Sequence, residues 1–121
     1  MKKSIPLLLA IIFFMMACQK ENQVRITYVA TDAVSAYNLQ YLDADGLLNQ
    51  TTVSPESAQD QWRFEYMGNQ GDIVYVSGNY KDINSALKLM ILLDGKVYKQ
   101  ASNEGDTLKY LTVSGTIPYK D

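Results

Sequence analysis

The sequence predicts an all-β protein, an antiparallel sandwich or barrel of about eight strands. Three observations carry this prediction. Apolar and polar residues alternate with a period of two in most segments, which is the pattern of half-buried strands. Turn-forming residues separate these segments at intervals of roughly 8–12 residues, as in β-sandwiches. Beyond the N-terminal apolar run, no segment sustains the 3.6-residue period of an amphipathic helix.

The first four strands are expected at 24–28, 37–41, 48–53 and 62–66. The first two alternate cleanly between apolar and polar residues. The stretch 43–46 predicts a turn before the third strand, because Asp side chains cap local N–H groups and Gly accepts a positive φ. Pro55 rules out a central strand in the next connection. Trp62, Phe64 and Tyr66 give the fourth strand the most aromatic face in the chain, which we expect to belong to the core.

The last four strands are expected at 73–80, 86–93, 97–101 and 108–117. The segment 73–80 opens with consecutive apolar residues, which favours a central strand that is covered on both faces. The next two strands are joined by Asp94-Gly95. Because both residues tolerate a positive φ, this pair predicts a two-residue type I′ hairpin.

The N-terminus carries the signature of a bacterial lipoprotein signal. Lys2 and Lys3 precede an apolar run, 5–17, of thirteen residues. A transmembrane helix needs about 20 residues, whereas a run of this length suits the core of a secretory signal. Cys18, the only cysteine, follows directly, and residues 15–18 resemble a lipobox. The resemblance implies cleavage before Cys18 and acylation of its thiol and amine; the alternative is an ordinary signal peptide, or an uncleaved short anchor, with a chance cysteine.

The chain therefore divides into a helical signal peptide (1–17), a polar tether (18–23) and a β-sandwich domain (24–121). We expect the protein in the cell envelope, held to a membrane by the lipid on Cys18. The residue after Cys18 is Gln19 and not Asp, which favours the outer membrane or the cell surface.

Composition argues against several classes of function. The net charge is −2, and nucleic-acid binding needs clustered Lys and Arg. The chain has no histidine, which is the commonest general base and transition-metal ligand. It also has no Gly-x-Ser-x-Gly motif, no Walker loop and no Cys–His pairing. We therefore expect no enzymatic activity, no cofactor, no metal and no nucleic-acid partner.

Two acidic clusters are candidate sites. Asp43, Asp45 and Gly46 have the start of a calcium loop, but the later oxygen ligands are missing and a hairpin turn is favoured. Glu104 and Asp106 are spaced like a pair of carboxylates for acid–base work. Nothing indicates a cleft between them, so exposed turn residues are expected.

The order and spacing of four segments are similar to the soluble domain of the mycobacterial MmpS (mycobacterial membrane protein small) proteins and to small lipoproteins of Bacteroidetes-type bacteria. These segments are 24–29, 37–46, 71–78 and 89–97, and the resemblance covers most of residues 24 to 117. It implies an immunoglobulin-like β-sandwich of about 7–8 strands, tethered in the envelope. MmpS proteins are accessories to large resistance-nodulation-division-type export permeases, so the resemblance also implies a transport partner. This chain has a lipobox cysteine where those proteins have a transmembrane helix.

The function expected from these observations is that of a non-enzymatic binding or accessory module with a protein partner, in a membrane transport or surface complex. Lys88, Met90 and Leu92 share one face of the strand 86–93. An apolar stripe on a wet sheet face marks an interaction surface if it is contiguous. The competing interpretation is that a neighbouring strand or loop covers the stripe.

The alternative function is a carbohydrate- or small-ligand-binding lipoprotein. Nine tyrosines are available as stacking surfaces. Those near strand ends, or opposite apolar neighbours, are the expected exposed candidates: Tyr80, Tyr98, Tyr110 and Tyr119.

Overall fold

The computed structural model describes residues 23–105 and 110–119. The predicted signal peptide, Cys18 and most of the tether lie outside the described residues, as does Asp106. The described part contains no helix long and apolar enough to cross a membrane.

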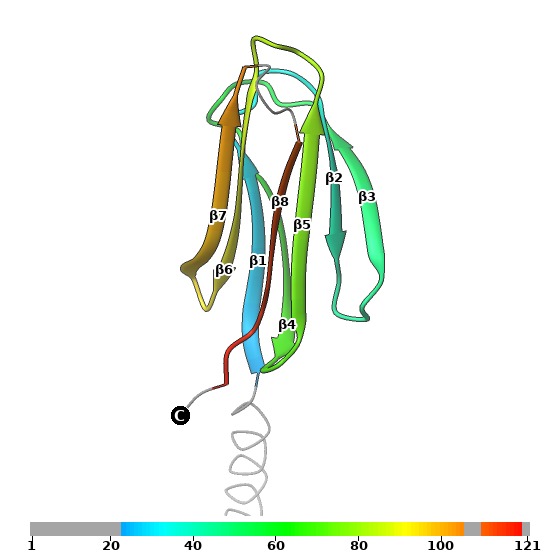
Figure 1. The fold of residues 1–121 in the computed structure, drawn as a ribbon, viewed down its shortest axis with the longest axis vertical. Coiled ribbons are helices and arrows are strands. Elements are labelled where there is room, and N and C mark those ends of the chain that lie inside the picture. Colours follow the sequence, from blue (N-terminus) through cyan, green and yellow to red (C-terminus); the bar gives the residue numbers. More distant parts are fainter. Residues whose placement is uncertain (1–22, 106–109, 120–121) are drawn as a thin grey trace, which may run out of the picture.

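The prediction of an antiparallel all-β sandwich is confirmed. Eight strands form two four-stranded sheets that pack face to face (Figure 1). Sheet A has the order β4-β1-β6-β7 and sheet B the order β3-β2-β5-β8. The strands are β1 (Gln23–Thr31), β2 (Tyr37–Leu42), β3 (Leu48–Val53), β4 (Trp62–Asn69), β5 (Ile73–Tyr80), β6 (Ala86–Leu93), β7 (Lys96–Glu104) and β8 (Tyr110–Thr116).

The core lies between the two sheets and is built from alternate residues of each strand. Tyr28 of β1, Leu39 of β2 and Leu89 of β6 are at most 1% exposed. The aromatic residues expected in the core, Trp62 and its neighbours on β4, are half-buried and pack against this cluster from the edge of sheet A. The aromatic face therefore closes the side of the sandwich.

The Asp94-Gly95 hairpin is confirmed. Asp94 has φ 51° and Gly95 has φ 83°, both positive as a type I′ turn requires. The returning strand β7 is longer than predicted, because it pairs with β6 from Lys96 opposite Leu93 to Glu104 opposite Ala86.

The strand β5 is central, as predicted, but the expectation that both faces are covered is wrong. Its inward residues Val74 and Val76 are fully buried, whereas Ile73, on the opposite face, is 64% exposed. The reason is that sheet B is the outermost layer on that side, and no other strand within 23–105 and 110–119 packs over it (Figure 1).

The two ends of the sandwich differ in what they carry. At one end lie the start of β1, the β2–β3 and β6–β7 hairpins, the β4–β5 turn and the C-terminal segment after β8 (Figure 1). We call this the N-terminal end, because the chain from Cys18 enters here at Gln23. The opposite, distal end carries the β1–β2, β3–β4 and β5–β6 connections, the end of β7 and the start of β8.

Candidate ligand-binding face

Sheet B differs from sheet A in having no charged residue in any of its strands. The strands β2, β3, β5 and β8 contain no Asp, Glu, Lys or Arg. Every strand of sheet A carries at least one charge, and β7 carries Lys96, Lys99 and Glu104. A water-facing sheet surface without charges is unusual, because charged side chains are the common way to keep such surfaces and their edges solvated.

The distal half of the outer face of sheet B carries amide and hydroxyl side chains in two rows that cross the strands. The strand registers align these residues side by side. The row nearer the distal end is Thr52, Asn38, Asn79 and Tyr110, and the next row is Gln50, Gln40, Ser77 and Thr112. Because neighbouring strands lie about 4.8 Å apart, each row spans roughly 14 Å.

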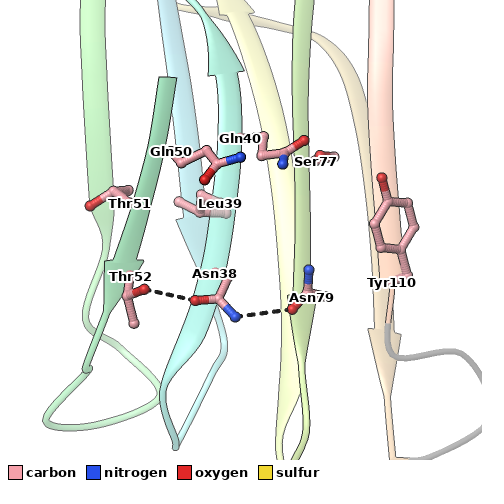
Figure 2. Close-up of a pocket in the computed structure, with 9 residues that line it drawn as sticks. All are labelled: Asn38, Leu39, Gln40, Gln50, Thr51, Thr52, Ser77, Asn79 and Tyr110. Atoms are coloured by element: carbon pink, nitrogen blue, oxygen red, sulfur yellow. Dashed lines mark hydrogen bonds between the residues drawn. The ribbon is translucent and has the colours of Figure 1, made fainter. Parts of the chain in front are cut away.

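Hydrogen bonds order the distal row in one direction (Figure 2). The Thr52 hydroxyl donates to Asn38 Oδ1 at 2.7 Å, and Asn38 Nδ2 donates to Asn79 Oδ1 at 3.2 Å. These two bonds use neither amide hydrogen of Asn79. The row therefore holds the Asn38 amide in a fixed orientation and leaves the Asn79 amide N–H groups outside these two bonds, with the Asn79 nitrogen directed along β5 (Figure 2).

Tyr110 lies along the sheet instead of standing away from it. Figure 2 shows its ring broadside, with the hydroxyl directed along β8 toward the level of Ser77. Hydrogen bonding to the hydroxyls of Ser77, Thr112 and Tyr75 lowers the pKa of Tyr110. Ser77 is only 2% exposed, while Tyr110 is 48% exposed. The ring thus presents a flat apolar surface beside the amide row, with Ser77 on the neighbouring strand next to its hydroxyl (Figure 2).

These residues line a shallow open groove of about 460 Å³. Thr52 and Asn79 are near the ends of β3 and β5, and Asn38 and Tyr110 are near the starts of β2 and β8. All four positions lie toward the distal end, so the groove is on the half of sheet B that is away from Gln23 (Figure 1).

The predicted stripe lies on the outer face of sheet A, on the other side of the molecule. Lys88 and Met90 are half-buried, and Leu92 is 9% exposed. The stripe is flanked by β1 and β7 in the same sheet: Val29 lies opposite Met90, and Val97 lies opposite Leu92. As an interaction surface it stays a prediction, and Leu92 offers little accessible area to it.

The four tyrosines expected at the surface divide into two groups. Tyr110 and Tyr119 are exposed, as predicted, at 48% and 74%. The prediction for Tyr80 is wrong: it is 3% exposed and its hydroxyl donates to the carbonyl oxygen of Gly105. Tyr98 is half-buried, since its ring packs over Gly115 and its hydroxyl donates to the Thr116 carbonyl oxygen.

The segment that starts like a calcium loop is a hairpin turn. The Asp43 carboxylate accepts hydrogen bonds from the N–H groups of Asp45 and Leu47 and from Asn49 Nδ2, at 2.9–3.0 Å. These bonds, with that of Asn49 first, lower the pKa of Asp43. Within residues 23–105 and 110–119, no group of three His, Cys, Asp or Glu side chains is placed to hold a metal ion. The carboxylate thus shapes the turn.

Sequence reasoning named only Tyr110 among the groove residues. Asn38 and Asn79 are 41 positions apart, and only the pairing of β2 with β5 brings them together. The feature of the sequence that could have indicated the groove is the lack of charged residues in four of the eight strand segments. No family model matches the chain, and no curated protein matches it.

Proposed function

We propose that the protein is a lipid-anchored envelope module that binds a neutral, hydroxyl-rich carbohydrate on the outer face of sheet B. The observation that carries this proposal is the groove formed by two uncharged polar rows and the exposed ring of Tyr110. This is the second of the two functions expected from the sequence, and the groove is what favours it.

The chemistry of the groove suits a sugar better than a charged ligand or a peptide side chain. Sugars present alternating hydroxyl groups that donate and accept hydrogen bonds, and Asn and Gln amides offer both kinds of partner on one side chain. The apolar faces of a sugar ring stack on aromatic rings, and Tyr110 lies flat enough to receive one.

The lack of charge in the sheet also selects the ligand. An anionic or cationic ligand would be desolvated against sheet B without a counter-charge in any of its four strands. Burying an unpaired charge is costly, whereas neutral hydroxyls can exchange water for the amides of Asn79 and Gln40. We therefore infer a preference for neutral over acidic or amino sugars.

Lipid attachment at Cys18 is part of the same proposal and rests on the sequence signal. Acyl chains on Cys18 would hold the domain at a membrane, since two or more chains give lasting attachment. The groove would then be held at a distance from the membrane, because it lies toward the distal end of sheet B, and it would open to the side of the domain.

A glycan array of neutral and charged oligosaccharides tests the ligand. We expect saturable binding to neutral glycans, and a loss of at least about fivefold in affinity for Tyr110→Ala, since aromatic stacking contributes about 1–3 kcal/mol in comparable sites. Tyr119→Ala is the matched control, because Tyr119 is exposed but lies at the N-terminal end. Equal effects of the two variants, or binding of charged glycans only, would contradict the proposal.

A protein partner remains the second candidate, and one observation favours it. Val97, next to the predicted stripe, is 53% exposed and lies opposite Leu92. The stripe therefore continues from Met90 onto β7 as an apolar patch, and such a patch could dock on a permease of the kind that the MmpS resemblance implies. Capture of membrane partners by wild type but not by Met90→Asp would support this role.

A further inference from the structure

Exposed apolar side chains gather at the N-terminal end of the sandwich. Among the described residues, nine large hydrophobic side chains are exposed, and three of them belong to the distal end: Val34, Ile83 and Tyr110. The other six lie in or beside the turns and strand ends of the N-terminal end: Leu47, Leu48, Met67, Ile73, Val97 and Tyr119.

The six come from different parts of the chain, and the topology brings them to one end. Leu47 and Leu48 follow the β2–β3 turn, and Met67 and Ile73 flank the β4–β5 turn. The other two are Val97, beside the β6–β7 hairpin, and Tyr119, after β8 (Figure 1). Their exposed fractions run from 52% for Met67 to 74% for Tyr119. These side chains are not buried in the core of the domain, so packing within the domain does not explain why they are apolar. If they were distributed at random over the surface, they would not gather at one end.

The length of chain before β1 identifies what this end would meet. Gln23 is five residues after Cys18, which at full extension is a reach of about 17 Å. If Cys18 carries acyl chains in a bilayer, the N-terminal end is held within that distance of the lipid headgroups. Tyrosine and aliphatic side chains are the residues that favour the boundary between headgroups and acyl chains.

We propose that the N-terminal end of the sandwich rests on the bilayer surface and inserts these six side chains into its interfacial layer. This inference builds on the proposed lipid anchor and adds an orientation to it. The contact is apolar and not electrostatic, because the turns at this end also carry Asp43, Asp45, Asp72 and Asp94. Those carboxylates would oppose attraction to anionic lipid. The orientation holds the sheet B groove, which opens to the side, at the end of the domain that is away from the membrane.

Bromolipid quenching of tryptophan fluorescence tests the orientation in the acylated protein, reconstituted in phosphatidylcholine vesicles. The probes are Ile73→Trp and Ile83→Trp, which replace exposed isoleucines of similar exposure, 64% and 56%, at opposite ends. The native Trp62, which lies at the start of β4 at the distal end, also emits, so the emission of wild type is subtracted from that of each variant. We expect brominated acyl chains to reduce the added emission of Ile73→Trp at least about twofold and to leave that of Ile83→Trp unchanged.

Three further readouts separate the possible failures. Metabolic palmitate labelling of wild type but not of Cys18→Ser supports the anchor, and absence of label overturns the anchor and with it this orientation. If palmitate labels the wild type but the added emission of Ile73→Trp and Ile83→Trp is quenched equally, the orientation is overturned and the anchor is still supported. Quenching that disappears in high salt overturns the apolar contact, since screening weakens only charge interactions. In wild type, a slowing of amide hydrogen exchange on addition of vesicles that is larger at 43–48 than at 81–85 supports the orientation without a substitution, and an equal slowing of the two segments contradicts it.

Discussion

The hydroxyl groups of Tyr28 and Tyr66 are 2.9 Å apart, and the direction of this hydrogen bond follows from the other bonds that Tyr28 makes. The Tyr28 hydroxyl donates its one hydrogen to the Leu42 carbonyl oxygen at 2.8 Å and accepts from the Tyr75 N–H at 3.3 Å. Tyr66 is therefore the donor to Tyr28. One buried hydroxyl on β1 thus joins sheet A to two strands of sheet B.

This arrangement predicts that Tyr28→Phe is more destabilising than Tyr66→Phe. Removing the Tyr28 hydroxyl leaves the Leu42 carbonyl, the Tyr75 N–H and the Tyr66 hydroxyl without this partner, which should cost about 2–3 kcal/mol. Removing the Tyr66 hydroxyl breaks one bond at the half-buried edge and should cost about 1 kcal/mol. Urea denaturation followed by Trp62 fluorescence measures both. Equal midpoints for the two variants would show that Tyr28 is not the hub.

Stability should decline at alkaline pH, because two buried phenols and one half-buried phenol resist ionisation in the folded protein. Burial, with a smaller contribution from Asp60, raises the pKa of Tyr37 to about 12, and burial also raises the pKa values of Tyr28 and Tyr66. In the unfolded chain these groups ionise near pH 10. The free energy of unfolding is therefore at its full value below pH 10 and falls as the pH rises from 10 toward 12.

For Tyr37 alone the expected loss is about 1–2 kcal/mol, after allowing for solvent that reaches the pocket beside Asp60. Urea denaturation at a series of pH values measures it, and Tyr37→Phe is the control that should flatten part of the decline. A wild-type stability that is constant between pH 9 and 12 would contradict the burial of these hydroxyls.

The strands could be predicted from the sequence because the alternation of apolar and polar residues within each segment is local information. The strands 48–53, 73–80 and 86–93 were predicted at the bounds that the structure has, and the Asp94-Gly95 turn was also local information. The extension of β7 to Glu104 was missed because its residues are polar, and only pairing with β6 keeps them in a strand.

The groove could not be predicted because it depends on which strands are neighbours. Four of the six strand pairs join strands that are not consecutive in sequence, including β2 with β5 and β5 with β8. Sequence alternation places Asn38, Asn79 and Tyr110 on outward faces but does not place them in one row. Tyr80 was wrongly expected at the surface for the same reason, since the carbonyl that its hydroxyl binds belongs to Gly105.

Gly78→Ala should destabilise the sandwich by overpacking its core. A Cβ at this position would lie 2.8 Å from Leu87 Cδ2 and 2.9 Å from Leu39 Cδ2, and both leucines are at most 1% exposed. Overpacking of this kind costs about 1–3 kcal/mol. Gly46→Ala is the comparison, because a Cβ there meets no atom within 4 Å and only its φ of 75° opposes the change. Thermal unfolding should show the larger loss for Gly78→Ala; the reverse order would mean that β5 shifts easily away from β6.

The type I′ turn depends on Asp94, whose φ is 51° and whose carboxylate oxygen accepts a hydrogen bond from the backbone N–H of Arg25 at 3.0 Å. Asp94→Asn keeps both a residue that tolerates positive φ and an oxygen acceptor, so its stability should lie within about 0.5 kcal/mol of wild type. Asp94→Val places a β-branched residue at positive φ and removes the acceptor, which should cost about 2 kcal/mol or more. Urea midpoints of the two variants measure the difference. A valine variant as stable as the asparagine variant would mean that the hairpin adopts another turn type at little cost, and that β6 and β7 are held in register by their side chains alone.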